Sequence, residues 1–264
     1  MSTQPGSLEM VARQWDYFRT LFRRTWRGSI VSNTVLPVFF LLAMGLGLGG
    51  YIDDGGSSTI GISYLAFIAP GMLATNAMTM AVGESTYPIW VSFKWEPVYS
   101  ARIATPLRIV DVLNGLVAFL LVRLVLTCAV MMAVLVAFGT VSSVAGGVGA
   151  VLMCTLLGLA YALPVFALSA SIDDDTPFAL LFRLGIIPMT LFSGAFFPVS
   201  QMPEVLQWVA YLTPIWHGVE SARMCTTGVV AWLPLAGHAG YLAVWVVAGW
   251  LLARRQFTAR LADG

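Results

Sequence analysis

The sequence predicts an all-α integral membrane protein. Hydrophobic residues make up 58% of its 264 residues, charged residues only 10%, and the mean hydropathy is +0.83. A soluble domain of this length could not bury so much apolar surface. The apolar residues also gather in runs of about 20, the helix length that crosses the hydrocarbon core of a bilayer.

Six of these runs are long enough to be predicted as transmembrane helices. The first is expected to remain as a span, because a long polar and aromatic segment precedes it where a cleaved signal sequence would have a short one. The predicted spans cover residues 30–50, 64–91, 109–138, 147–170, 179–198 and 229–253.

Lysine and arginine residues predict the orientation of these spans. Five arginines precede the first span, three cationic residues lie between the second and third, and three arginines follow the last. The connections around 51–63 and 139–146 contain none. By the positive-inside rule, both termini are expected to be cytoplasmic. The protein is expected to cross the inner or plasma membrane of the cell several times.

Residues 1–28 are predicted to form a basic amphipathic helix in the cytoplasmic interface, ahead of a six-span domain at 29–264. Apolar residues recur there at steps of three and four, and arginines fall on the other face. The helix is either an anchor or also a contact for a cytoplasmic partner. Its apolar positions are Leu8, Val11, Trp15, Phe18, Phe22 and Trp26.

The loop at 92–108 is the longest predicted cytoplasmic connection. Its mixed charges, aromatic residues and prolines favour a brief helix across the membrane face, although a solvated turn is the simpler alternative. In the next cytoplasmic loop, Asp173, Asp174 and Asp175 indicate a solvated helix start more than a cation site.

Three ionisable residues fall inside predicted spans: Glu84, Arg123 and Arg183. An unpaired charge at such a position costs at least about 2.5–3.5 kcal/mol on insertion scales, so each needs a partner or a water-filled cavity. Glu84 and Arg123 lie on consecutive antiparallel spans and are therefore a candidate pair. The pair would serve stability, or it would contact a substrate.

The stretch SGAFFPVSQMPEVLQWVAYLTPIWHG, residues 193–218, is apolar but contains three prolines. Proline removes a backbone donor and clashes with the preceding turn, so this is not one ordinary span. Pro198 is predicted to end the fifth span, Pro203 to open a short helix and Pro214 to end it. Broken backbone at membrane depth needs cover, which predicts an extracellular re-entrant helical hairpin at 196–223.

This hairpin is a candidate exit gate, with an interfacial cap as the alternative. Val205, Leu206, Val209 and Leu212 recur at helical spacing and are expected to lie on the bundle. Aromatic rings would line the exit, and His217 with Glu220 would contact a polar headgroup or make a structural hydrogen bond. The candidate gate residues are Phe196, Phe197, Pro198, Trp208, Tyr211, Pro214, His217 and Glu220.

The sequence shows no enzyme site of its own. It contains no G-x-x-x-x-G-K-[ST] phosphate loop and no nucleophile elbow, and its two histidines lack acidic neighbours at ligand spacing. We therefore expect no ATPase activity, cofactor or metal in this chain. The net charge of +1 gives no reason to expect a nucleic-acid partner. The three cysteines are expected to be packing residues.

Three features together resemble a known transport family. They are the basic amphipathic helix before six spans, the motif ATPLRIVD at 104–111, and FSGAFFPVSQMPEVLQWVAYLTPIWHGVESAR at 192–223. This order is similar to the permease subunit of type-2 ABC exporters, the group that includes permeases for nodulation lipo-oligosaccharides and daunorubicin-like drugs. KWEPVYSAR replaces the family's E-x-G-T-x-E-like stretch; it keeps Glu96 but lacks the glycine.

The resemblance implies one half of an ATP-driven exporter of a prokaryotic cell. Two permease chains, identical or different, would pair in the lipid, and separate ABC ATPase subunits would bind ATP and Mg. The helix of loop 92–108 would dock on those subunits, and an amphipathic drug, lipid or lipo-oligosaccharide would move outward. The implied coupling residues are Glu96, Arg102, Thr105, Pro106 and Leu107.

Two other classes remain open from the sequence alone. An ion-coupled secondary transporter would use intramembrane ionisable residues, and Glu84, Arg123 and Arg183 are candidates, although no convincing internal repeat accompanies them. An integral membrane transferase would need a cluster of nucleophile, base or metal ligands, which the sequence does not show.

Overall fold

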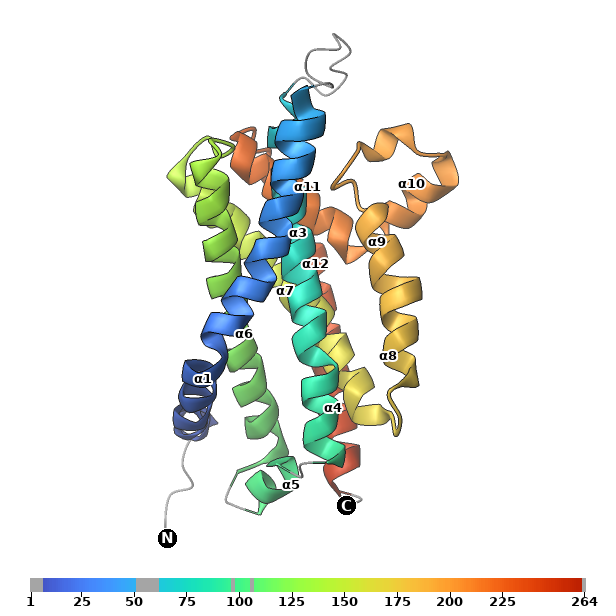
Figure 1. The fold of residues 1–264 in the computed structure, drawn as a ribbon. Coiled ribbons are helices and arrows are strands. Elements are labelled where there is room, and N and C mark those ends of the chain that lie inside the picture. The colour runs from blue at the N-terminus through green and yellow to red at the C-terminus, as the bar shows by residue number, and fades with distance from the viewer. Residues whose placement is uncertain (1–6, 51–61, 96–97, 105–106, 263–264) are drawn as a thin grey trace.

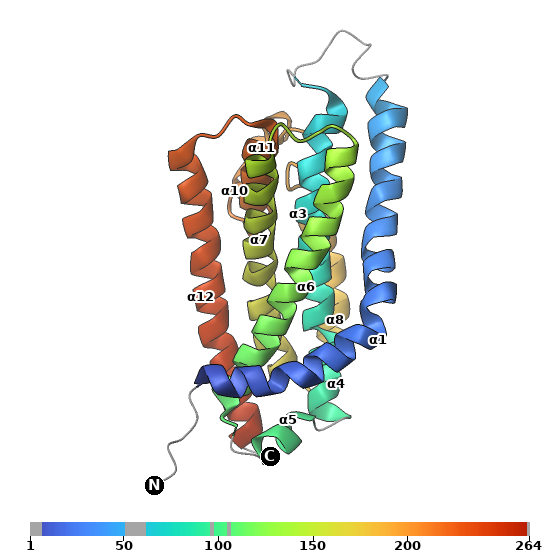
Figure 2. The same cartoon turned by 90° about the vertical axis from the view of Figure 1, so that its left-hand side faces the viewer.

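A computed structural model describes residues 7–50, 62–95, 98–104 and 107–262. These residues form helices joined by turns, with no strand among them. The long helices run side by side along one axis, and shorter helices close the two ends of the bundle (Figures 1 and 2). The prediction of an all-α membrane protein is therefore confirmed.

Four helical segments of the described chain are long and apolar enough to cross a bilayer. They match the second, third, fourth and sixth predicted spans, and the last extends further toward the C-terminus than predicted. The segments are α3 with α4 (Tyr64–Ser85 and Tyr87–Lys94), α6 (Ile109–Ala137), α7 (Val144–Ser171) and α12 (Trp232–Ala262).

The first and fifth predicted spans correspond to shorter apolar helices. Helix α1 (Ser7–Leu41) and the π-helical η1 (Leu42–Leu48) have an apolar part at Thr34–Gly45. The fifth run consists of α8 (Thr176–Leu180), the π-helical η2 (Leu181–Ile186) and α9 (Ile187–Leu191).

The fifth run ends well before the predicted proline. Helix α9 stops at Leu191, and Gly194 adopts a φ of +79° that a residue with a side chain rarely takes. The prediction that Pro198 ends the helix was therefore wrong, because the left-handed glycine turns the chain first.

Helix α1 lies across the lower end of the bundle and then turns upward along it (Figure 2). It does not end at residue 28, so the predicted interfacial helix and the first apolar run form one element. Its lower part packs on α6: Gln14 Nε2 donates to the Asp111 carbonyl at 2.8 Å, and the Phe18 ring stacks on Phe119 at 4.7 Å. The lower part of α1 therefore packs against α6 on one side and is exposed on the other.

A break separates α3 from α4 at Thr86, whose φ of −92° and ψ of −103° are not helical. The break would leave the Ser85 carbonyl without its helical donor, and Ser169 Oγ of α7 donates to that carbonyl at 2.7 Å. Below it, the predicted short helix of loop 92–108 is present as α5 (Val98–Ile103).

Helix α7 lies at the centre of the molecule and packs against α3, α11 (Pro214–Thr227) and α12. Buried apolar side chains form one cluster in each half of the bundle. Ile68, Met78 and Leu157 belong to the upper cluster, and Leu124 and Phe166 to the lower one. The three cysteines are buried and unbridged.

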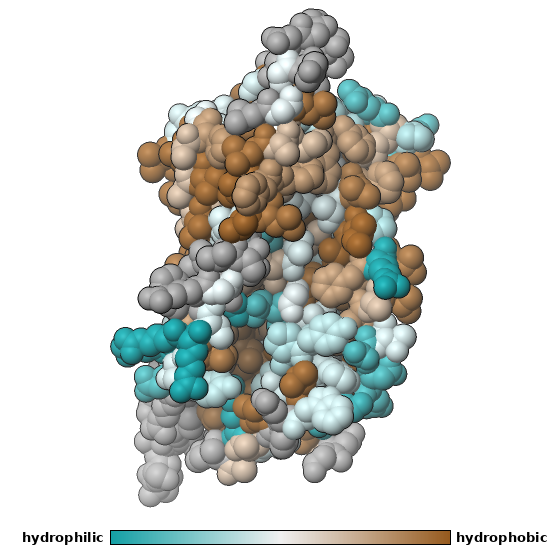
Figure 3. All heavy atoms as spheres, in the orientation of Figure 1, coloured by the Kyte–Doolittle hydropathy of each residue, from teal (hydrophilic) through white to brown (hydrophobic). Residues whose placement is uncertain are grey.

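The surface of the molecule divides into an apolar upper part and a more polar lower end. Hydrophobic residues form a broad band over the upper part of the face in Figure 3; hydrophilic residues gather mainly toward the lower end, with a smaller group at the upper right. Helix α5, the start of α1 and the end of α12 all lie at that lower end (Figure 1). The cationic residues predicted to be cytoplasmic therefore gather at one end of the bundle.

Candidate functional site

A cavity of about 330 Å³ opens between α1, α3 and α9. We call it cavity 1. Most of its polar lining comes from one stripe of α3, where Thr75 and Thr79 are four residues apart and lie beside Asn76 and Glu84; Gly83 continues the stripe one turn further. Thr190 of α9 adds one more hydroxyl group. The apolar lining consists of Leu36, Pro37, Phe40, Met72, Met80 and Phe196.

Glu84 is the last residue of α3 that lines cavity 1, and it also lines a second, smaller cavity. This cavity 2, of about 110 Å³, lies beneath the lower part of α1 and is bounded by α4, α5 and α6. Arg123 Nη1 donates to Glu84 Oε2, and the two side chains are 9% and 28% exposed. The candidate pair is therefore formed, and it stands where the two cavities meet.

Arg183 is not part of this pair. It lies on the exposed side of η2 and has no carboxylate partner among the residues that the structure describes. An exposed arginine on a helix at the lipid-facing surface can extend its charged group toward the interface.

Of the candidate coupling residues, Arg102 belongs to α5 and Leu107 follows it; Glu96, Thr105 and Pro106 lie outside the described residues. Arg102 is half-buried, and its guanidinium lies 4.6 Å from the centre of the Tyr17 ring of α1. Its Nη1 also donates to Gln14 Oε1 at 3.3 Å. Leu107 packs against the lower core cluster.

The proline-rich segment after α9 forms three short helices. The 3₁₀-helix η3 (Val199–Gln201) follows Pro198, and α10 (Glu204–Tyr211) begins directly after Pro203, as predicted. Pro214 starts α11, which returns beside α7 and α3. We call residues 192–227 the hairpin; they include the predicted 196–223, and the prediction that this segment re-enters the membrane is taken up below.

The apolar face of α10 does not lie on the bundle as expected. Val205, Val209 and Leu212 are 74%, 52% and 69% exposed, and only Leu206 is partly buried. Helix α10 instead turns the side of Leu206 and Ala210 inward, and Ala210 is its buried residue.

The candidate gate residues fall into two groups. Phe197 and Trp208 are exposed, whereas Phe196 lines cavity 1 and its carbonyl accepts from the Tyr64 hydroxyl at 3.3 Å. Tyr211, Pro214, His217 and Glu220 lie at the inner side of the hairpin, and Pro198 precedes η3. The structure therefore separates an outward aromatic surface from an inner polar cluster.

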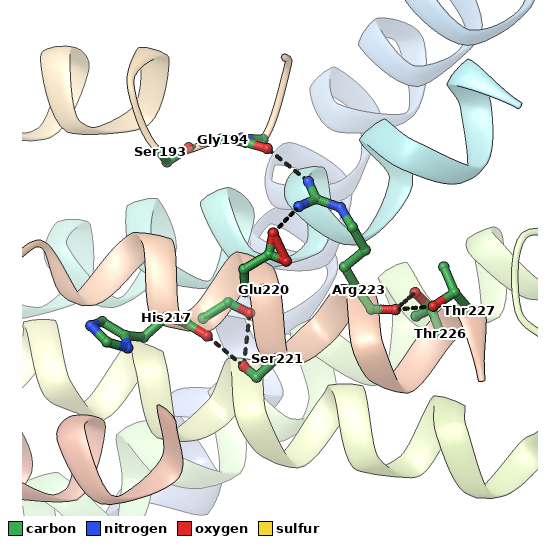
Figure 4. A network of polar contacts seen from close by, with 10 residues as sticks. Ser193, Gly194, His217, Glu220, Ser221, Arg223, Thr226 and Thr227 are labelled. Carbon is green, nitrogen blue, oxygen red and sulfur yellow. Dashed lines mark hydrogen bonds and ion pairs between the residues drawn. The ribbon is translucent and has the colours of Figure 1, made fainter. Parts of the chain in front are cut away.

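Arg223 joins the two ends of the hairpin (Figure 4). Its Nη2 donates to the Gly194 carbonyl at 2.7 Å, and its Nη1 donates to Glu220 Oε1 at the same distance. The guanidinium lies 4.1 Å from the centre of the Phe67 ring of α3. Sequence reasoning passed over Arg223 as a site residue, although it lies three residues after Glu220, a spacing that puts both on one helix face.

A second polar cluster lies beside it. His217 Nδ1 and His238 Nδ1 of α12 are 2.8 Å apart, and the His217 ring stacks on Tyr241 at 3.9 Å. Burial lowers the pKa of His217 below its usual value, and the His238 ring lowers it further. His238 and Tyr241 were missed because their contact with the hairpin depends on how α12 packs.

These features define the class of protein. The chain is an all-helical membrane protein that has a polar-striped cavity between its apolar helices and a broken hairpin at one end. A family model described as ABC-2 type transporter matches residues 14–226. The chain therefore belongs to the ABC-2 type transporter family, whose permeases work in general with ABC ATPase subunits.

The chain is also similar to named permeases over most of its length. Nodulation protein J of Rhizobium leguminosarum bv. viciae is 31% identical over 281 residues, which cover 97% of this chain and 96% of that protein. Nodulation protein J of Rhizobium leguminosarum bv. trifolii is 30% identical, with 97% and 95% covered. The inner membrane transport permease YadH of Escherichia coli K12 is 27% identical, with 88% of each chain covered.

Proposed function

We propose that this chain is the permease subunit of an ATP-driven exporter that moves an amphipathic substrate out across the cell membrane. Cavity 1 is the observation that carries the proposal. Its stripe of hydroxyl, amide and carboxylate groups on α3 faces apolar side chains of α1 and Phe196. A polar headgroup and an apolar body would each find a matching wall there.

Six spans with both termini in the cytoplasm are part of this proposal. The apolar parts of α1 and of α8 to α9 would complete the membrane domain, and a second permease chain would cover their outward faces. The hairpin at 192–227 would then be re-entrant on the extracellular side. Its support is that α5 and the cationic helix ends share the opposite end of the bundle.

Separate ATPase subunits, which bind ATP and Mg, would dock on α5. Arg102 supports this role, because it links α5 to the lower part of α1 and could pass a displacement from one to the other. Arg102→Ala is expected to reduce transport while ATP hydrolysis continues. Arg19→Ala is the matched control, because Arg19 is an exposed arginine in the lower part of α1.

A cavity-filling variant tests the transport path. Thr79→Trp should fill cavity 1 and abolish ATP-dependent export from vesicles that contain the permease and its ATPase. Val148→Trp should leave export unchanged, because Val148 lines an apolar groove on the outer surface of α6 and α7. Equal export by both variants would contradict the proposed path, and export driven by an ion gradient without ATP would favour a secondary transporter.

A further inference from the structure

The two histidines of this chain meet in space although they are separated in sequence. His217 lies on α11 one turn before Glu220 and Ser221 (Figure 4), and His238 lies near the start of α12. Their Nδ1 atoms are 2.8 Å apart, and His217 Nε2 is 3.0 Å from the Tyr211 carbonyl oxygen. The pair therefore connects the end of α10, the return helix α11 and α12.

These two distances determine where the protons lie. A carbonyl oxygen can only accept, so His217 Nε2 must carry a hydrogen. In the neutral pair, His217 Nδ1 is therefore the acceptor and His238 Nδ1–H is the donor. One more proton can be added at His238 Nε2 without changing this bond. A second added proton would leave an N–H on both facing nitrogens and no acceptor between them.

The charged and titratable groups around the pair come from three helices. On α11, Glu220 is ion-paired with Arg223. On α12, Tyr241 stacks on His217, and its hydroxyl donates to the Leu212 carbonyl at 2.5 Å. On α7, the Tyr161 hydroxyl is the nearby titratable group, and it lies 3.5 Å from Met189 Sδ. The carboxylate beside the pair is therefore already bound to an arginine, and no other carboxylate among the described residues contacts either ring.

Aromatic rings enclose the remaining sides. The Trp216 ring lies 4.9 Å from the His217 ring and 5.2 Å from the His238 ring, and Tyr211 lies 4.7 Å from Trp216. An aromatic face attracts a single imidazolium, but it does not screen two adjacent ones as water would.

We propose that His217 and His238 form a proton-operated latch on the hairpin. The latch is closed while the pair holds at most one added proton, and it opens when both rings are charged. Opening would separate His217 from His238 and so loosen the packing of α11 and of the end of α10 against α12. The latch itself does not depend on the proposed function. Only the statement that it senses the pH outside the cell rests on the orientation proposed there.

The lowered pKa of His217 gives the direction of the pH dependence. A closed pair that disfavours the proton is fully stable above the ordinary histidine pKa of about 6.5 and loses stability as the pH falls below it. The latch is therefore closed in neutral and alkaline medium and opens in acid.

Magnetic resonance of the full chain in lipid nanodiscs tests the protonation states directly. With ¹⁵N-labelled histidine, only two rings contribute signals. At pH 8 we expect one ring protonated on Nε2 and the other on Nδ1. We expect two separate protonation steps, the second at a lower pH than that of an ordinary histidine. Two identical tautomers, or two independent steps near 6.5, would overturn the proposal.

Hydrogen exchange of α10 tests the opening. After correction for the intrinsic effect of pH, exchange across Glu204–Tyr211 should rise about tenfold through the second step. His238→Gln should remove that rise. Tyr241→Phe loses the bond to Leu212 but no imidazole, so it should raise exchange at every pH and keep the step. A rise that persists in His238→Gln would refute the latch. Neither experiment needs an ATPase or a substrate, so their failure would leave the proposed export function untouched.

Discussion

The Glu84–Arg123 pair gives a stability prediction that the structure makes quantitative. Arg123→Leu removes the guanidinium that contacts Glu84 and leaves the carboxylate inside the bundle. The comparison is a double-mutant cycle with Glu84→Gln, which replaces the carboxylate by a neutral group of the same shape. The cycle isolates the energy of the pair from the other packing contacts of each residue.

The expected magnitude follows from burial. Removing one partner of a fully buried ion pair costs about 3–5 kcal/mol. The Glu84 side chain is 28% exposed toward two cavities, so the lower end, about 3 kcal/mol, applies to Arg123→Leu. In the Glu84→Gln background the same substitution should cost about 1 kcal/mol, because only a neutral amide loses its partner. The coupling energy is then about 2 kcal/mol, within the range for residues in contact.

Thermal unfolding in lipid nanodiscs or detergent measures this difference. By the scaling for soluble domains of similar length, 3 kcal/mol corresponds to a drop in Tm of about 6–12 °C. A coupling energy near zero, with both single variants destabilised and their effects additive, would refute the assignment of a stabilising pair.

Two substitutions test other contacts. Gly71→Ala would place its Cβ 2.7 Å from the Ala195 Cα, so it should cost about 1–3 kcal/mol of unfolding free energy; Gly83→Ala has nothing within 4 Å and should be neutral or stabilising by up to about 1 kcal/mol. Ser169→Ala removes the donor to the Ser85 carbonyl at the α3–α4 break and should cost about 1–3 kcal/mol, measured as a lower Tm. An unchanged Tm in Gly71→Ala or Ser169→Ala would contradict the corresponding contact.

Long apolar runs were the part of the fold that sequence could predict well. Four of the six predicted spans are helices of the expected length, because hydrophobicity over about 20 residues is a local property. The ends of the first and fifth runs were less predictable. Helix α1 continues through residue 28, and α9 stops before Gly194, because packing and a single left-handed residue decide those boundaries.

The contacts of the candidate site also differ in how far the sequence could predict them. The Glu84–Arg123 contact was foreseeable from two charges on neighbouring spans, whereas the role of Arg223 and the pairing of His217 with His238 were not. Arg223 reaches Gly194 across 29 residues, and the two histidines meet across 21. Such contacts depend on where α11 and α12 settle against α7, which periodicity along one helix does not specify.

The hairpin contacts follow from one physical requirement. Prolines and Gly194 interrupt the helical ladder between α9 and α11, which leaves backbone carbonyls without helical donors. Four side chains of α3, α11 and α12 supply donors instead. Arg223 donates to Gly194, Tyr64 to Phe196, His217 to Tyr211 and Tyr241 to Leu212. Because α3, α11 and α12 each contribute, a shift of any of these helices must change how a hairpin carbonyl is satisfied. The cover of the hairpin's broken backbone therefore depends on the positions of α3, α11 and α12.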